Sequence, residues 1–128
     1  MTNLRPRTLV EVAGLAAGGD SFDRCLANFL DEFYAAPKRE ALAVEPRLLA
    51  PQFGELGHVQ DAYLAAAEEL ARAFQLPVPA WTTGAARKLH HPWFASPLAA
   101  LRAVLLLESP AGFRARNLFV SENALTRA

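Results

Sequence analysis

The feature that most constrains the fold is a run of apolar side chains in residues 21–36 with the spacing of a helix. Large apolar residues recur there at steps of three and four: Phe22, Cys25, Leu26, Phe29, Leu30 and Phe33. Because an α-helix turns once every 3.6 residues, this spacing places all six on one face. Asp20 or Ser21 supplies the N-terminal cap, and Pro37 ends the helix. Its apolar face needs other elements to cover it.

Similar spacing divides much of the remaining chain into further helices. The predicted ranges are 7–17, 38–44, 56–75, 97–108 and 110–117, with a last turn through Leu125. The pair Gly18-Gly19 ends the first of them, since glycine adopts the left-handed conformation of a C-cap at little cost. Residues 56–75 are predicted as the longest helix, with apolar side chains from Leu56 to Phe74 along one stripe.

Proline marks the segments that interrupt these helices. Residues 46–57 hold two prolines and two glycines and are predicted as a connection with one helical turn. In LPVPAW, residues 76–81, the two prolines favour extended geometry, which predicts a rigid strap. Ser96-Pro97 opens a helix that is apolar around most of its circumference, which predicts a central position for 97–108. No run alternates long enough to predict a strand.

The predicted fold is therefore all-α. We expect a compact single domain over residues 1–128, with about five to seven helices, two of them short, and a Pro/Trp-rich strap. Apolar residues make up 52% of the chain and charged residues 20%, which favours a folded protein over a disordered one.

Charge and cysteine content exclude several classes of protein. The 13 basic and 13 acidic side chains cancel, so no overall charge favours nucleic acid or anionic lipid. Cys25 is the single cysteine, which excludes an internal disulfide. The N-terminus lacks the basic-then-apolar pattern of a secretory signal, and the apolar run 104–107 is far below the roughly 18 residues that span a bilayer. We expect a cytoplasmic protein with no membrane association.

The two ends of the chain differ in charge. Residues 1–86 hold 7 Lys/Arg and 11 Asp/Glu, whereas 87–128 hold 6 and 2. This asymmetry produces either a basic face or an attraction between the two parts, and we favour the attraction.

The stretch RKLHHPWF, residues 87–94, concentrates the most chemistry in the fewest positions. Adjacent histidines diverge on a helix and in extended chain, so His90 and His91 are poorly placed to share a metal ion. Pro92 favours extended geometry for His91, and burial of the aromatic side chains against the helices would stabilise the fold. The stretch is best interpreted as a hydrophobic clasp with its cations and histidines at the rim.

Eight residues form the candidate interaction surface, because aromatic and arginine side chains supply much of the contact energy in protein interfaces. They are Trp81, Arg87, Lys88, His90, His91, Trp93, Arg114 and Arg116. The two arginines of AGFRARNLF do not share a helix face, and we expect them either in solvent or paired with the acidic part of the chain. The acidic pairs Asp31-Glu32 and Glu68-Glu69 are interpreted as solvated helix faces, and Cys25 as a small buried apolar residue.

Three segments resemble an uncharacterised family of small bacterial helical proteins. They are FLDEFYAAPKREALAVEP (29–46), DAYLAAAEELARAFQLPVPAWT (61–82) and HPWFASPLAALRAVLLLESPAGFRARNLFVSENALTRA (91–128). Genes of that family often lie beside a predicted nucleotidyltransferase or a helix-turn-helix regulator, as in toxin–antitoxin loci. The resemblance implies binding to a partner protein, such as a neighbouring nucleotidyltransferase-type protein. It implies no catalytic residue.

We therefore expect a protein without enzymatic activity, metal or cofactor that acts as an interaction or antitoxin-like regulatory partner. A homodimer is also possible if the aromatic stretch stays exposed. Two alternatives remain open. A nucleic-acid-binding accessory protein would use the basic C-terminal third, and a small enzyme would use His90 or His91 as a base. A pocket that holds an imidazole beside a carboxylate would favour the enzyme.

Overall fold

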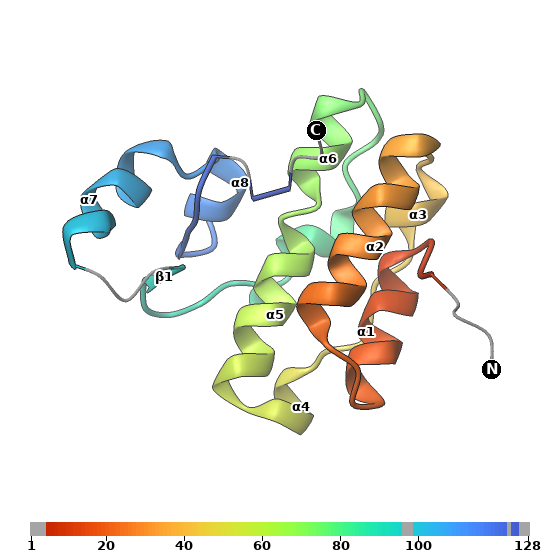
Figure 1. The fold of residues 1–128 in the computed structure, drawn as a ribbon, viewed down its shortest axis with the longest axis horizontal. Coiled ribbons are helices and arrows are strands. Elements are labelled where there is room, and N and C mark those ends of the chain that lie inside the picture. Colours follow the sequence, from red (N-terminus) through yellow and green to blue (C-terminus); the bar gives the residue numbers. More distant parts are fainter. Residues whose placement is uncertain (1–4, 96–98, 123, 126–128) are drawn as a thin grey trace.

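The structure, a computed structural model, describes residues 5–95, 99–122, 124 and 125. It confirms the all-α class, because the described strands form only one two-residue pair. The helices are α1 (Leu9–Ala17), α2 (Phe22–Ala35), α3 (Glu40–Ala43), α4 (Ala50–Phe53), α5 (Glu55–Ala65), α6 (Glu68–Ala73), α7 (Ala99–Glu108) and α8 (Ala111–Arg114). Two 3₁₀ turns, η1 (Ala80–Thr83) and η2 (Ala85–Arg87), and the strands β1 (Trp93–Phe94) and β2 (Leu118–Phe119) complete them. Figure 1 shows α1, α2, α5 and α6 as the main body, with α7 set apart from it.

Helices α1 and α2 form a hairpin that local sequence signals define at both ends. The Thr8 side chain accepts a hydrogen bond from the Glu11 backbone N–H, and the Glu11 carboxylate accepts one from the Thr8 N–H, a reciprocal capping box. Gly19 has φ +103°, so the turn between the helices uses a conformation that glycine adopts at little cost. Ser21 then caps α2 by accepting from the Arg24 N–H, which confirms one of the two predicted caps.

The core lies where the apolar face of α2 meets α1, α5 and α6. All six apolar residues that predicted α2 are buried, Cys25 included. Phe29 stacks on Phe33 with ring centroids 5.8 Å apart, and Phe33 meets Phe74 edge-to-face at 5.2 Å. On the side facing α8, Tyr63 meets Phe113 at 5.0 Å. Aromatic packing therefore joins the two ends of the chain within one core.

The predicted long helix over 56–75 is divided into α5 and α6. At the junction, the Ala67 N–H bonds to the Leu64 carbonyl and the Glu69 N–H to the Ala66 carbonyl, both three residues back. These short-range bonds tighten the turn, as in a 3₁₀ helix, and interrupt the α-helical ladder. Periodicity gave no sign of the break. The predicted stripe was also only partly right, because only Ala66 and Leu70 of it are buried and Leu56 is 61% exposed.

The connections between α2 and α5 and between α6 and β1 largely follow the proline signals. Residues 46–57 contain one short helix, α4, as predicted. The chain leaves α6 through Gln75, which has φ +57°. The predicted strap 76–81 is non-helical only over residues 76–79, because Ala80 and Trp81 begin the 3₁₀ turn η1. η1 and η2 both pack against α5.

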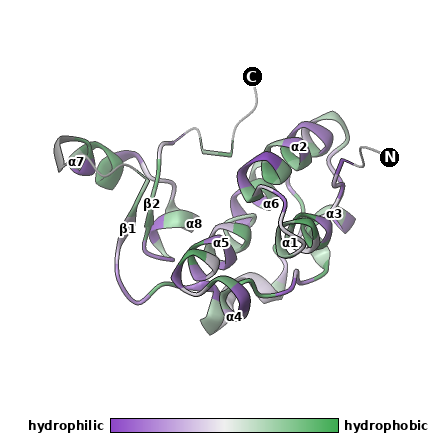
Figure 2. Ribbon diagram, turned by 60° about the horizontal axis from the view of Figure 1, so that its bottom comes forward, coloured by the Kyte–Doolittle hydropathy of each residue, from purple (hydrophilic) through white to green (hydrophobic). Residues whose placement is uncertain are grey.

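Helix α7 differs most from its prediction. Its apolar circumference predicted a central position, but Leu101, Val104, Leu106 and Leu107 are all exposed, and only Leu105 among its described side chains is buried. Figures 1 and 2 both show α7 outside the main body, beyond the β1–β2 pair. The predicted Ser96-Pro97 cap lies outside the described residues. The hydropathy of a helix indicates that it needs apolar contacts, but it does not indicate whether those contacts come from the same chain.

The β1–β2 pair joins the RKLHHPWF stretch to the C-terminal segment. The strands run parallel, with Trp93 opposite Leu118 and Phe94 opposite Phe119. The Trp93 N–H donates to the Asn117 carbonyl at 2.8 Å, and the Ala95 N–H to the Phe119 carbonyl at 3.0 Å. Backbone bonds therefore position the stretch that the sequence predicted as a clasp.

Candidate interaction surface

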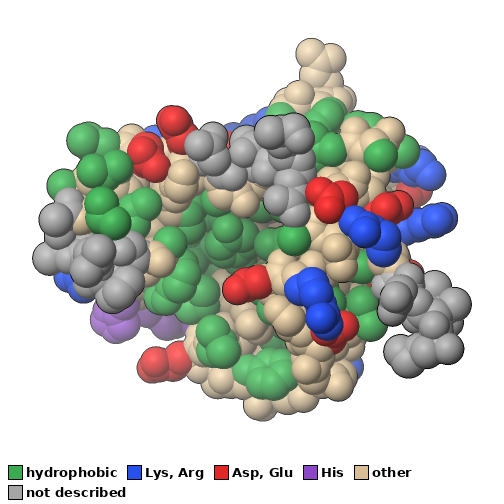
Figure 3. All heavy atoms as spheres, viewed as in Figure 1, with side chains coloured by type: hydrophobic (Ala, Val, Ile, Leu, Met, Phe, Trp, Pro, Cys, Tyr) green, Lys and Arg blue, Asp and Glu red, His purple; other side chains and the backbone are tan. Residues whose placement is uncertain are grey.

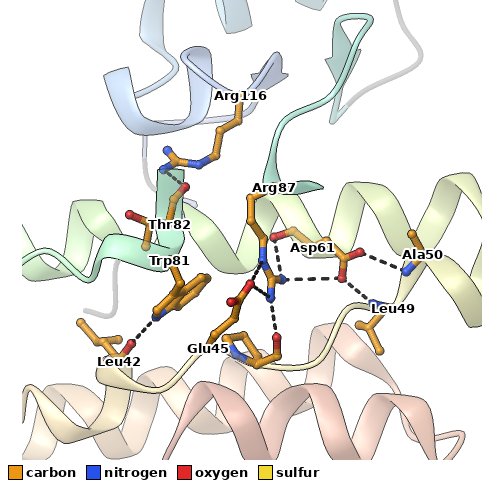
Figure 4. A network of polar contacts seen from close by, with 10 residues as sticks. Leu42, Glu45, Leu49, Ala50, Asp61, Trp81, Thr82, Arg87 and Arg116 are labelled. Carbon is orange, nitrogen blue, oxygen red and sulfur yellow. Dashed lines mark hydrogen bonds and ion pairs between the residues drawn. The ribbon is translucent and has the colours of Figure 1, made fainter. Parts of the chain in front are cut away.

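Arg87 lies inside the protein and anchors η2 to the body. Its side chain is 1% exposed, and its guanidinium donates to Glu45 Oε2 from Nε at 3.3 Å and from Nη2 at 3.1 Å. It also donates to the carbonyl oxygens of Pro46 and Asp61 and lies 3.7 Å from Asp61 Oδ1 (Figure 4). The guanidinium carbon is 5.0 Å from the centroid of the Trp81 ring. The prediction that Arg87 stays at the rim was wrong.

Asp61 is the fully buried carboxylate of this network. It accepts hydrogen bonds from the Leu49 N–H at 2.6 Å and the Ala50 N–H at 3.0 Å. Asp61 therefore caps the N-terminus of α4 although it belongs to the next helix, α5. Because buried charges are stable only with partners, Asp61 depends on these two amides and on Arg87. The helical stripe gave no indication of its burial.

Arg116 forms a second internal anchor. Its guanidinium donates to Glu68 Oε1, to the Gly112 carbonyl and, at 2.6 Å, to the Thr82 carbonyl of η1. Arg116 and Glu68 are both buried, so the prediction of a solvated Glu68 was wrong, as was a solvent-exposed Arg116. The alternative, that the basic end of the chain pairs with the acidic part, is confirmed by Arg116–Glu68 and Arg87–Glu45.

Trp81 also belongs more to the interior than to the surface. It is half-buried, and its indole N–H donates to the Leu42 carbonyl at 2.9 Å (Figure 4). Three of the eight residues of the candidate surface, Trp81, Arg87 and Arg116, therefore stabilise the fold. Lys88, His90, His91 and Arg114 are exposed, and Trp93 is half-buried. The two arginines were hard to assign from sequence because the carboxylates that pair with them come from distant parts of the chain.

The exposed histidines meet a third one from α5. The rings of His58 and His90 have centroids 6.1 Å apart, and His58 Nε2 lies 3.0 Å from the Lys88 carbonyl oxygen. A carbonyl oxygen only accepts, so Nε2 carries the proton and the neutral ring keeps its lone pair on Nδ1. Glu55, His58, His90 and His91 all line one hollow of about 290 Å³. The structure thus brings histidines together that the sequence kept apart.

An apolar groove runs from this hollow along α5 and α2. Two further hollows, of about 270 and 400 Å³, adjoin it, and Trp93 lines all three. We call this the Trp93 groove, and its principal lining residues are Leu26, Leu30, Leu56, Val59, Tyr63 and Trp93. Figure 3 shows it as a hollow of hydrophobic side chains between the α7 end and the main body.

Acidic side chains border the groove. Asp23 lines two of its hollows and Glu55 the third, and neither forms an ion pair with another residue in the described part of the chain. Burial raises the pKa of the Tyr63 hydroxyl to about 12, and the negative charge of Asp23 adds to the shift. Tyr63 therefore presents a neutral phenol, and a ligand of the groove meets apolar surface with negative charge at the edge.

The α7 face lies beside this groove. We define it as Leu101, Val104, Leu106 and Leu107, of which Leu107 is 84% exposed. Arg102 lies on the same helix, with its guanidinium carbon 5.3 Å from the Phe94 ring centroid. Sequence reasoning missed both the α7 face and Leu56 as surface residues, because it assigned their apolar side chains to the core. The only available signal was that α7 is apolar on nearly every side.

Other features of the described residues give weaker evidence of a functional site. Between residues 5 and 125, gaps excepted, no three His, Cys, Asp or Glu side chains are placed to hold one metal ion. No helix within these ranges has the length and apolarity to span a membrane. A hollow of about 410 Å³ near Arg7, Glu32 and Lys38 carries charges of both signs and favours no single ligand. Burial raises the pKa of the Cys25 thiol, which does not favour a nucleophile.

Comparison with known proteins adds no identity. No protein-family model matches the chain, and neither a curated protein nor a solved structure matches it.

Proposed function

We propose that this protein is a non-catalytic interaction protein, an antitoxin-like regulatory partner, that binds through the α7 face and the Trp93 groove. One observation carries the proposal: α7 exposes four large apolar side chains and contacts its own chain chiefly through β2. Helices that are apolar on all sides are normally buried. A surface helix of this composition is therefore best explained by contact with another protein.

The size and chemistry of the surface support this reading. With about 200 Å² for a fully exposed leucine or valine, the exposed fractions on α7 amount to roughly 400 Å² of surface, within the range of the largest patches on monomeric proteins, which are often functional. The adjoining groove adds Leu56 and the half-buried Trp93. An apolar centre with charged groups at its margin is the usual organisation of a protein interface.

The resemblance to a family encoded beside nucleotidyltransferases or helix-turn-helix regulators suggests the class of partner. The resemblance implies that the chain binds a partner protein. The proposed partner is a nucleotidyltransferase-type protein.

The test is affinity capture from the native host with three tagged baits. Wild type is compared with Leu107→Glu, which places a charge on the α7 face, and with Val44→Glu, a matched control at an apolar residue that is 65% exposed and does not line the groove. The proposal expects a protein captured in stoichiometric amount by wild type and Val44→Glu, and at least about tenfold less by Leu107→Glu. Equal capture by all three baits, or capture of nothing by wild type, would reject it.

The histidine hollow favours a second candidate, a small hydrolytic enzyme. His58 presents an unprotonated Nδ1 in its neutral form, and Glu55 and His90 line the same hollow. The lining of this hollow therefore contains both imidazoles and a carboxylate, the groups that general acid–base chemistry uses. Turnover of chromogenic ester and phosphoester substrates that is lost in His58→Asn would support this candidate, and activity equal in wild type and variant would exclude it.

Nucleic-acid binding loses support from the same geometry. Two of the six basic side chains in residues 87–128, Arg87 and Arg116, are buried in ion pairs and do not reach a phosphate backbone.

A further inference from the structure

The histidine hollow collects every imidazole of the chain. The sequence holds three histidines, and His58, His90 and His91 all line this one hollow of about 290 Å³. Figure 3 shows histidine side chains gathered at one edge of the molecule. Glu55 lines the hollow as well, and it forms no ion pair with another residue in the described part of the chain. Imidazole and carboxylate are common ligands of Zn²⁺, so the hollow brings metal-binding groups together from two distant segments.

Glu55 and His58 have a spacing that metal sites use. They stand three residues apart in ELGH, in the first turn of α5, so they are neighbours on the same side of the helix. A glutamate and a histidine at this spacing supply ligands to metal ions in several helical bundles. One helix therefore contributes two of the groups, and the stretch 88–93 contributes a third.

His58 is already oriented as a metal ligand. Its Nε2 donates to the Lys88 carbonyl oxygen at 3.0 Å, which leaves the lone pair of Nδ1 free to bind an ion. Histidines that bind metal ions usually donate their other ring N–H to a carbonyl or a carboxylate, and this bond fixes both the tautomer and the ring orientation. The Lys88 backbone provides that bond here.

His90 lies close enough to share an ion with His58. A ligand nitrogen lies about 2.1 Å from Zn²⁺, so the centroid of a bound imidazole lies about 3.2 Å from the ion. Two imidazoles on one ion then have centroids about 5.2 Å apart in tetrahedral geometry, and at most about 6.4 Å apart. The centroids of His58 and His90 are 6.1 Å apart, so a movement of about 1 Å reaches the tetrahedral separation.

We propose that Glu55, His58 and His90 bind a divalent transition-metal ion such as Zn²⁺, with water completing the coordination. In the described residues the three side chains do not yet converge on one point. Glu55 and His90 are exposed, so both side chains can rotate toward the ion that His58 holds. The sequence predicted no metal site because nothing in it indicated that His58 and His90 meet. The bound ion joins α5 to the stretch 88–93, a role that goes beyond the proposed function.

The test is calorimetric titration of the untagged, metal-free full chain with Zn²⁺. We expect one ion per chain in wild type, and an affinity at least about tenfold lower in each of Glu55→Gln, His58→Asn and His90→Asn, because even an outer partner of a ligand is worth about 10–100-fold. His91→Asn is the matched control. His91 is exposed and lines the same hollow, but adjacent histidines diverge, so this variant should bind like wild type. Mg²⁺ should give no binding heat, since it prefers oxygen ligands.

Thermal unfolding gives a second measurement on the same proteins. At a Zn²⁺ concentration about 100 times the wild-type dissociation constant, the melting temperature of wild type and His91→Asn should rise by about 10 °C. With affinities at least about tenfold lower, the three ligand variants should gain no more than about 5 °C. Circular dichroism without metal checks that each variant is folded.

The variants also define how the proposal fails. Absence of Zn²⁺ binding by wild type up to about 1 mM overturns the site. Binding that none of the three substitutions weakens indicates an adventitious ion only, and so does an equal loss in His90→Asn and His91→Asn. Either result overturns the site as assigned and leaves the proposed interaction surface unaffected, because Leu107→Glu tests that surface separately.

Discussion

Replacing Arg87 with methionine tests whether the buried network holds η2 on the body. The substitution keeps most of the side-chain volume but removes the positive charge and all the donors to Glu45, Pro46 and Asp61. Asp61, which is 0% exposed, then keeps only the two backbone amides of residues 49 and 50. The loss is therefore that of one partner from a buried ion pair.

Removing one member of a buried pair typically costs about 3–5 kcal/mol. Glu45 is half exposed, so solvent recovers much of its lost interaction, and methionine regains some apolar packing against Trp81. We therefore expect Arg87→Met to lower the free energy of unfolding by about 3 kcal/mol, the lower end of that range. With a urea m-value of about 1.5 kcal/mol/M, the unfolding midpoint falls by about 2 M.

The assay is urea unfolding followed by far-ultraviolet circular dichroism. Lys88→Met is the matched control, because Lys88 is the neighbouring cation and is exposed, so its loss should change stability by less than about 0.5 kcal/mol. The double variant Asp61→Leu with Arg87→Met should destabilise by less than the sum of the two single variants. Each single variant leaves one charge of the buried pair without its partner, whereas the double variant removes both charges. If Arg87→Met and Lys88→Met shift the midpoint equally, the reasoning about the network is wrong.

Three further predictions concern positions in or near the core. Gly57→Ala should destabilise by about 1–3 kcal/mol, since its Cβ would lie 2.8 Å from the Ala50 nitrogen, whereas Gly14→Ala, with open space around it, should be neutral or stabilising in thermal unfolding. The raised pKa of Tyr63 means that folding opposes its ionisation, so this contribution to stability is complete below pH 10 and is lost between about pH 10 and 12. Urea midpoints that fall equally in wild type and Tyr63→Phe over that range would contradict it. Cys25 should react with a thiol reagent at least about 100-fold more slowly in native protein than in urea, because burial both covers the thiol and raises its pKa. A native rate close to the unfolded rate would contradict this.

Local sequence determined most of the secondary structure. The stripe from Phe22 to Phe33, the Ser21 cap and the Gly18-Gly19 turn specify α1 and α2 through contacts within a few residues, and the structure reproduces them. The proline pairs likewise placed the strap and the α4 connection. These signals act locally through steric restriction and backbone hydrogen bonding, so they can be read without knowledge of the fold.

The candidate site was predicted only in part. The sequence identified Trp93, His90 and His91 as parts of a surface segment, and the structure places them along the groove or its adjoining hollow. It did not predict that His58 of α5 meets His90, nor that Leu56 of the same helix lines the groove. Those neighbours come from distant parts of the chain, and a single sequence holds no record of which distant residues touch.

The sequence by itself determined which residues are apolar, which are charged and where most of the helices lie. Only the tertiary structure decided where each group lies: Arg87 and Arg116 lie inside while Leu101, Val104 and Leu107 lie outside. The physical reason is that burial depends on long-range partners. A cation is stable in the interior when carboxylates and carbonyls such as those of Glu68 and Thr82 meet it there, and an apolar helix stays exposed when the rest of its chain leaves no surface to cover it.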